Sequence, residues 1–365
     1  MREASAFAPR LDNRQFIHNP TSRTDIPPKD VRTSRDPTLQ VRKTCRATCY
    51  DLRVGNLQPP RHLSEHSMSA LLSTFRASYG TVSFMTEFKS RLANWTTGNC
   101  NANGIDIHYL RTGGDYPPLI ALHGLLGDGA CLAPLARALE SDFDLVLPDA
   151  RGHGKSSAPA KGYSYGDQAG DVVELLRSLK LKAPILLGHS MGGMTAAVAA
   201  RELGAGVSGV VLVDPTFISP EWQREVFESD IAEEQRRSLL SHRSDLLVEA
   251  RGRHPLRSME ILEYLVDAKF RTSMSVFEVL TPPNPDYREL VRSLSVPILL
   301  VIAERGIVSL HMARELQELN PLLRYELIAD AGHGIPYDQP ERLGAVIMSV
   351  LRATSNPWVG SMHIH

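Results

Sequence analysis

The sequence predicts an α/β fold in which a doubly wound, mostly parallel sheet is covered by helices. From about Gly104 onward, short apolar runs typical of buried strands alternate with longer segments whose apolar residues recur at helical spacing. One of these strands passes into a helix without a linker, at Gly188. Strands that alternate with helices are joined by crossover connections, which place helices on both faces of a parallel sheet.

The expected elements follow one another from residue 105 to residue 328. We expect strands at residues 105–110, 119–122, 145–147, 185–187, 210–213, 298–302 and 325–328. Helices of the core are expected at residues 132–139, 167–179 and 194–203. This alternation assigns residues 85–215 and 293–355 to one α/β core.

The alternation stops between residues 216 and 292. Within this stretch, residues 221–240 and 259–270 have the apolar pattern of amphipathic helices. A helical insertion after one strand of a parallel sheet lies over the carboxyl ends of the strands, where ligands bind. We therefore expect residues 216–292 to form a helical cap over a pocket, with Trp222 and Phe227 among the side chains that bind the substrate.

The composition excludes several classes of protein. The 365 residues include 40 Lys or Arg and 41 Asp or Glu, so the net charge of −1 gives no reason to expect a nucleic-acid partner. No apolar run approaches the roughly 18 residues of a membrane-spanning helix. Four cysteines are too few for a disulfide scaffold. We expect a cytoplasmic protein that acts on a small molecule, and nothing in the sequence specifies an oligomeric state.

The first 84 residues differ from the rest of the chain. They hold thirteen Lys or Arg against seven Asp or Glu, and seven prolines fall within the first sixty positions, without any regular apolar period. Such a segment cannot bury enough apolar surface to offset the entropy of ordering it. Cys45 and Cys49 lack the second ligand pair of a metal site. We predict a disordered basic extension at residues 1–84, with Met85 as an alternative start, and a flexible tail at residues 356–365.

The motif Gly188-His189-Ser190-Met191-Gly192 carries the strongest chemical signal in the chain. It follows a buried strand and opens a helix, which is the setting that a G-x-S-x-G motif requires. The sharp turn would hold Ser190 in a strained conformation, with glycines on both sides because side chains there would collide. The helix amino terminus and the Met191 backbone N–H would face a developing oxyanion. Ser190 could instead be only a helix N-cap, but the context favours a nucleophile.

Three further segments accompany this motif. They are His123-Gly124-Leu125-Leu126-Gly127, Asp149-Ala150-Arg151-Gly152-His153-Gly154-Lys155-Ser156 and Ala329-Asp330-Ala331-Gly332-His333-Gly334-Ile335-Pro336. With all four segments in place, residues 100–352 resemble the α/β-hydrolase superfamily, in which a nucleophile, an acid and a histidine follow in that order along the chain.

The resemblance implies roles for several residues. His333 would be the general base that takes the hydroxyl proton of Ser190 and later returns a proton to the leaving group. The backbone N–H of Leu125 would be the second donor of the oxyanion hole. His123, His153 and His189 would stabilise loop backbones by hydrogen bonds, and His123 and Gly124 would also lie beside the substrate. The helical cap would follow the family's sixth strand.

The acid departs from the family's pattern. After the strand at residues 298–302 the family has Gly-x-x-Asp, and here Gly306 occupies the position of that Asp. Two carboxylates near strand ends remain as alternatives. Asp214 directly follows the strand at residues 210–213, as the acid does in some lipases of this fold. Glu304 lies two positions before Gly306, and its side chain is longer than that of Asp by one methylene group. Either could instead cap local backbone, and we favour Asp214 of the two.

These residues predict a serine hydrolase. It would cleave a carboxylic ester, lactone or thioester of a small apolar substrate through an acyl-serine intermediate, and it would need no metal, nucleotide or organic cofactor. Two alternatives remain open. The same triad could serve a carbon–carbon bond hydrolase, an acyltransferase or a lyase, or the fold could belong to a catalytically weak ligand-binding protein.

Overall fold

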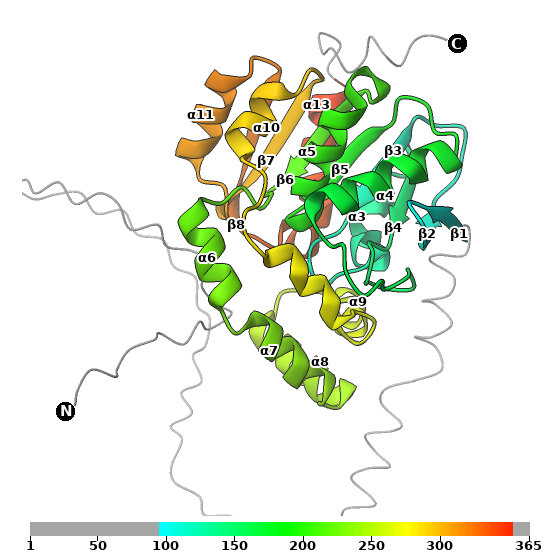
Figure 1. The fold of residues 1–365 in the computed structure, drawn as a ribbon, viewed down its shortest axis with the longest axis vertical. Coiled ribbons are helices and arrows are strands. Elements are labelled where there is room, and N and C mark those ends of the chain that lie inside the picture. The colour runs from blue at the N-terminus through cyan, green and yellow to red at the C-terminus, as the bar shows by residue number, and fades with distance from the viewer. Residues whose placement is uncertain (1–94, 353–365) are drawn as a thin grey trace, which may run out of the picture. The chain divides into compact units, whose positions relative to one another are not determined.

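The computed structural model describes residues 95–352, which contain one eight-stranded sheet (Figure 1). The strands are β1 (Thr96–Ala102), β2 (Ile105–Arg111), β3 (Pro118–Leu122), β4 (Asp144–Pro148), β5 (Ile185–His189), β6 (Gly209–Val213), β7 (Ile298–Arg305) and β8 (Leu323–Gly332). Their order across the sheet is β1-β2-β4-β3-β5-β6-β7-β8. β2 pairs antiparallel with β1 and β4, and all other neighbours are parallel. The predicted doubly wound, mostly parallel sheet is confirmed.

Three predictions concern residues outside the described range. They are the disordered extension at residues 1–84, the Cys45 and Cys49 pair, and the flexible tail at residues 356–365. Within residues 95–352, the structure has no helix with the length and apolar character needed to span a bilayer.

Helices cover both faces of the sheet because alternate residues of a strand point to opposite sides. Leu119 and Leu187 face one side, Ile120 and Leu186 face the other, and all four are fully buried. The first side packs against α3 (Ala133–Leu139) and α13 (Pro340–Leu351). The second side packs against α4 (Tyr165–Ser178), α5 (Met191–Leu203), α10 (Tyr287–Ser293) and α11 (Leu310–Leu319). Three short helices complete the described part of the core: the 3-10 helices η1 (Gly129–Leu132) and η2 (Gly204–Gly206), and α12 (Ile335–Asp338).

A helical insertion lies between β6 and β7. It consists of α6 (Pro220–Glu228), α7 (Ile231–Leu239), α8 (Arg243–Arg253), α9 (Met259–Phe270) and η3 (Met274–Leu280). Figure 1 shows α6 to α9 gathered at one end of the sheet. The predicted helix at residues 259–270 is present, whereas residues 221–240 form two helices because Ser229 adopts an extended backbone conformation between them.

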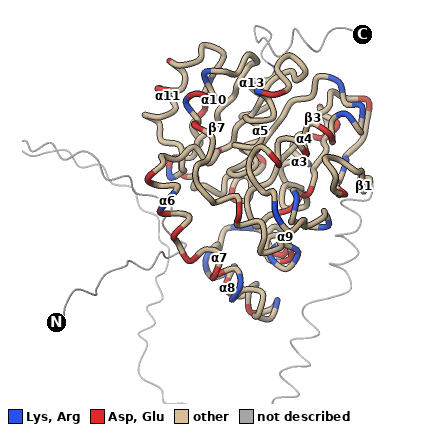
Figure 2. Tube along the Cα trace, in the orientation of Figure 1, with Lys and Arg blue, Asp and Glu red and all other residues tan. Residues whose placement is uncertain are grey.

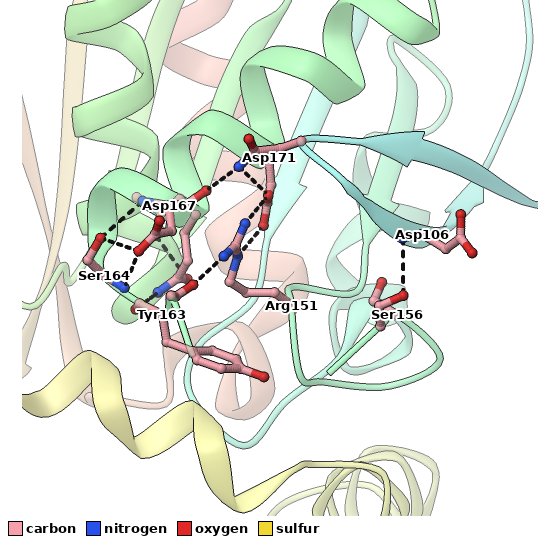
Figure 3. A network of polar contacts seen from close by, with 12 residues as sticks. Asp106, Arg151, Ser156, Tyr163, Ser164, Asp167 and Asp171 are labelled. Atoms are coloured by element: carbon pink, nitrogen blue, oxygen red, sulfur yellow. Dashed lines mark hydrogen bonds and ion pairs between the residues drawn. The ribbon is translucent and has the colours of Figure 1, made fainter. Parts of the chain in front are cut away.

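The loop after β4 is fixed by buried charged groups (Figure 3). Nε of Arg151 donates to Oδ2 of Asp171 at 2.6 Å, and both side chains are buried. Asp149 accepts hydrogen bonds from the backbone amides of Gly129 and Lys155. Burial alone would raise the pKa of Asp149, but these bonds and one from the His108 ring outweigh it and lower that pKa. The loop is therefore a rigid support for the neighbouring segments at this end of the sheet.

Candidate active site

Ser190 lies at a sharp turn between β5 and α5. Its backbone angles are φ +55° and ψ −118°, a combination that non-glycine residues rarely adopt. A Cβ on Gly188 would collide with the carbonyl of Gly192, and a Cβ on Gly192 would collide with the carbonyl of Leu122. The predicted strand–turn–helix geometry is confirmed. The turn directs the Ser190 side chain toward a cavity, although only 8% of the residue is exposed.

A chain of two hydrogen bonds links Ser190 to a buried carboxylate. Oγ of Ser190 donates to Nε2 of His333 at 2.9 Å, and Nδ1 of His333 donates to Oδ2 of Asp214 at 2.6 Å. An ionised carboxylate can only accept hydrogen bonds, so the proton of neutral His333 lies on Nδ1 and Nε2 accepts from the serine. These residues directly follow β5, β8 and β6, and their arrangement can carry a proton away from the serine hydroxyl.

Asp214 is fully buried, and the loop after β7 satisfies its carboxylate. The backbone amide of Ile307 donates to Oδ2 at 2.9 Å, and that of Val308 donates to Oδ1 at 3.0 Å. A Cβ on Gly306 would lie 2.5 Å from Oδ1 of Asp214. Glycine at the family's usual acid position therefore leaves the room that the Asp214 carboxylate occupies.

Glu304 lies outside this chain of hydrogen bonds. Its side chain is 52% exposed, and Oε2 accepts a hydrogen bond from the backbone amide of Asp330 at 2.8 Å. Of the two carboxylates that the sequence left open, the structure brings Asp214 to His333 and uses Glu304 to hold local backbone.

The loop after β3 lies against the serine. A Cβ on Gly124 would lie 3.2 Å from Cβ of Ser190, and Leu125 and Met191 line the same cavity as the serine. Within residues 95–352, neither the Leu125 nor the Met191 backbone amide donates a hydrogen bond to the protein. Both N–H groups are therefore free to bind an oxyanion that forms beside Ser190.

A family model described as alpha/beta hydrolase fold matches residues 117–340, which is more than half of the chain. The chain belongs to the alpha/beta hydrolase fold family.

Individual relatives of this alpha/beta hydrolase are enzymes that catalyse hydrolysis. N-formylmaleamate deformylase of Pseudomonas putida is 30% identical over 259 residues, which cover 66% of this chain and 91% of that protein. Serine hydrolase BPHL of Mus musculus is 28% identical over 217 residues, covering 58% and 70% respectively. The crystal structure of E-2-(acetamidomethylene)succinate hydrolase matches with a TM-score of 0.63 at 22% identity, covering 71% of this chain and all of that one. The comparisons thus support a hydrolase of this fold.

A cavity of about 550 Å³ opens beside Ser190 and His333 in this alpha/beta hydrolase. This volume lies within the range of small-molecule sites. The insertion between β6 and β7 supplies much of the apolar lining, including Trp222, Val226, Ile231, Leu246, Leu262 and Leu265. Gly124, Leu125 and Trp222 line this cavity, and the predictions that Gly124 and Trp222 bind the substrate and that Leu125 is an oxyanion donor stay predictions.

Two of the expected substrate-binding residues do not line this cavity. Phe227 follows Trp222 by five positions, so the Phe227 side chain points about 140° away from that of Trp222 around the axis of α6. Phe227 is 50% exposed and does not line the cavity. His123 is buried, and both nitrogens of its ring bind backbone. Nδ1 donates to the Gly124 carbonyl at 2.8 Å, and Nε2 accepts from the Ala150 amide at 2.9 Å. His123 therefore holds the backbone of two loops and does not face the substrate cavity.

Two further buried histidines support the loops around the site. Nε2 of His189 donates to the backbone carbonyl of His333 at 2.8 Å, and the His189 ring packs beside that of Tyr337. Burial, and then the nearby His333, hold the pKa of His189 well below its usual value. Burial and the nearby His123 lower the pKa of His153 to about 3. His189 and His153 are therefore neutral near pH 7 and serve to position backbone.

Sequence reasoning missed two cations of the cavity, Arg257 and Lys269. A single Lys in an amphipathic helix, or a single Arg in the turn between two helices, is usually solvated, so neither Lys269 nor Arg257 stands out by residue type. The pattern of α9 contains a usable signal, because Lys269 continues the stripe formed by Leu262, Leu265 and Val266 at positions i, i+3 and i+4. These four residues of α9 all line the cavity.

Proposed function

We propose that this protein is a serine hydrolase that cleaves a carboxylic ester, lactone or thioester through an acyl-serine intermediate. The observation that carries the proposal is the hydrogen-bonded chain from Ser190 through His333 to Asp214, which opens on a cavity of small-molecule size. The match of the chain to hydrolases of this fold supports it. Helices of the insertion act as the cap that shapes the cavity.

In the first half of the reaction, Oγ of Ser190 attacks the acyl carbon while Nε2 of His333 takes the hydroxyl proton. The carbonyl π electrons move to the oxygen, which becomes an oxyanion. The N–H groups of Leu125 and Met191 donate to this oxyanion, and Asp214 stabilises the imidazolium. Collapse of the tetrahedral intermediate breaks the bond to the leaving group, which takes the proton from His333 and leaves the acyl group on Ser190.

In the second half, water takes the place of the leaving group. His333 accepts a proton from water, the resulting hydroxide adds to the acyl carbon, and the same two N–H groups stabilise the second oxyanion. The acyl–oxygen bond to Ser190 then breaks, and the serine oxygen recovers its proton from His333. The enzyme returns to its starting state, and a carboxylic acid is released.

Amide hydrolysis is a second candidate for the same site. It is favoured by the 30% identity to N-formylmaleamate deformylase, whose name states that it removes a formyl group. The residues and steps would be the same, with nitrogen in place of oxygen as the leaving atom. The ratio of turnover on an ester and on the amide of the same acid distinguishes the two candidates.

Replacement of the nucleophile tests the proposal. In the Ser190→Ala variant we expect hydrolysis of 4-nitrophenyl butyrate to fall by at least about 10⁴-fold, because only binding and the oxyanion hole would remain. Ser208→Ala is a matched control, since this half-buried serine does not line the cavity and its hydroxyl donates to the Ala183 carbonyl. Circular dichroism would check that both variants fold. A folded Ser190→Ala protein with near wild-type turnover would contradict the mechanism.

A further inference from the structure

The charged residues that line the cavity are mostly cationic. They comprise four cations, Arg253, Arg257, Lys269 and Arg305, and two carboxylates, Glu249 and Asp338. Residues 85–365 as a whole contain 27 Lys or Arg and 34 Asp or Glu, so the cavity lining is positively charged although this part of the chain carries a net negative charge. Lys and Arg positions along α8 and α9 are visible in Figure 2. The local excess of positive charge favours an anionic ligand.

Two of the four cations are occupied by groups of the protein. Arg253 pairs with Glu249, one helical turn earlier in α8. Arg305 is half exposed, lies 3.8 Å from Glu304 and donates to the Asp330 carbonyl at 3.2 Å. These two residues therefore have little free capacity for a substrate.

Only some of the hydrogen-bond donors of the Arg257 guanidinium have an acceptor in the described residues. Its Nε donates to Oδ1 of Asp338 at 2.7 Å, and its side chain is 11% exposed. Within residues 95–352, neither terminal nitrogen of this guanidinium has a hydrogen-bond acceptor. Nη2 lies 2.6 Å from where a Cβ on Gly334 would be, so the guanidinium borders the loop that carries His333. Arg257 can therefore offer two donors close to the reacting centre.

Lys269 has no direct counter-charge. Its side chain lines the cavity from α9, and no carboxylate of residues 95–352 lies within ion-pair distance of its Nζ. Burial, and then the nearby Arg253, lower the pKa of Lys269, while Glu249 and Glu234 offset part of that effect from a distance. A partly buried ammonium without a counter-ion is unfavourable, and an anionic ligand would relieve that cost.

We propose that the substrate of this enzyme carries a carboxylate, which binds between Lys269 and Arg257 while its acyl carbon lies at Ser190. The inference rests on the proposed function, because it concerns the same cavity. A guanidinium can bind a carboxylate through two parallel hydrogen bonds, and the ammonium adds a flexible point charge. Apolar residues such as Trp222 and Leu265 would contact the carbon chain between the two ends. The substrate class is therefore a monoester or monoamide of a small dicarboxylic acid.

Binding of a dicarboxylate tests the anion site without turnover. Glutarate and adipate would be titrated into the Ser190→Ala protein by isothermal calorimetry, with adipamide as the uncharged comparison. We expect adipamide to bind more weakly, and Lys269→Gln in the same background to weaken dicarboxylate binding by at least about tenfold. Lys269→Arg should restore most of the affinity. Lys182→Gln, at an exposed position outside the cavity, is the control for the change in net charge.

Substrate preference supplies the second measurement. Monomethyl glutarate and methyl 5-methylhexanoate have similar shapes, but only the first ends in a carboxylate. The wild-type ratio of kcat/KM for these two esters should favour the carboxylate by at least about tenfold, and Lys269→Gln should bring the ratio close to one. Lys269→Arg should keep the preference, because it retains the positive charge.

The two measurements separate this inference from the proposed function. Equal dicarboxylate binding by the Lys269→Gln and control proteins, or no binding at millimolar concentration, would overturn the carboxylate site. Ser190-dependent ester turnover without a preference would also overturn it, while leaving the serine hydrolase in place. Lys269-dependent binding of dicarboxylates without turnover of esters or amides would instead retain the carboxylate site and contradict the proposed function.

Discussion

The ends of β6 and β7 are neighbours in the sheet, yet they differ in almost every property that matters for a catalytic acid. Asp214 at the end of β6 is fully buried and receives hydrogen bonds from His333, Ile307 and Val308. Glu304 at the end of β7 is about half exposed, accepts a hydrogen bond from the Asp330 backbone amide and lies 3.8 Å from the Arg305 side chain. The comparison teaches that burial, backbone donors and free space decide which carboxylate can orient His333, and that position in the sequence does not.

The two strand ends also depend on each other. The loop after β7 has no acidic side chain at Gly306, but it supplies the two amides that hold the carboxylate of Asp214. A buried carboxylate needs such donors, because an unsatisfied charge in the interior is costly. We therefore infer that Asp214 can be the acid only together with the loop after β7, which supplies its hydrogen-bond donors. The carboxylate then follows β6 and not β7, where the family usually has it.

The largest expected effect comes from removing the charge at the end of β6. Asp214→Asn should lower kcat on 4-nitrophenyl butyrate by roughly 10⁴-fold, because the amide cannot fix the tautomer of His333 or stabilise its cationic form. Steady-state kinetics at pH 7 to 8 would measure this loss, with circular dichroism to check folding. A loss of less than about tenfold in a folded protein would remove Asp214 from the proposed triad.

A smaller effect is expected from filling the space beside the carboxylate. Gly306→Ala places a methyl group 2.5 Å from Oδ1 of Asp214, so the carboxylate or the loop must shift. We expect kcat to fall by about 10²-fold, the size of effect that a misplacement of about 1 Å can cause. Gly252→Ala is the matched control, because an added Cβ there meets no atom within 4 Å. Equal activity of the two variants would show that the space at Gly306 is not needed.

The smallest effect is expected at the end of β7 itself. Glu304→Gln keeps an oxygen that can accept from the Asp330 amide, so kcat should change by no more than about threefold. The same ester and pH would be used as for Asp214→Asn. A loss for Glu304→Gln that exceeds the loss for Asp214→Asn would reverse the comparison between the two strands.

The sequence predicts the core of the fold because its strands are continuous apolar runs separated by helical patterns. The edge strand β1, with the sequence Thr-Thr-Gly-Asn-Cys-Asn-Ala, has no such pattern, since both of its faces are largely polar and it forms through pairing with β2. Helix α8 has a weak apolar periodicity, and only Leu246 of its residues is buried. Tertiary contacts, which a local pattern does not contain, stabilise both elements.

The candidate active site likewise has residues that the sequence predicts and residues that it does not. Ser190 and His333 belong to local motifs with a strand–turn–helix or strand–loop setting, so their positions follow from the sequence. The choice between Asp214 and Glu304 depends on the amides of a loop 93 and 94 residues away from Asp214, which no local pattern reports. The sequence predicts that His123 supports loop backbone, which the structure shows, but it also predicts His123 and Phe227 at the substrate, and neither residue lines the cavity.

The most direct test of the central claim is the rate at which a fluorophosphonate labels Ser190, followed by mass spectrometry of the modified peptide. Only a serine activated through His333 and Asp214 should react rapidly. We predict a single adduct on Ser190 that forms at wild-type rate in Glu304→Gln and at least about 10²-fold more slowly in Asp214→Asn. The absence of an adduct on Ser190, or equal labelling rates in Asp214→Asn and Glu304→Gln, would contradict the account.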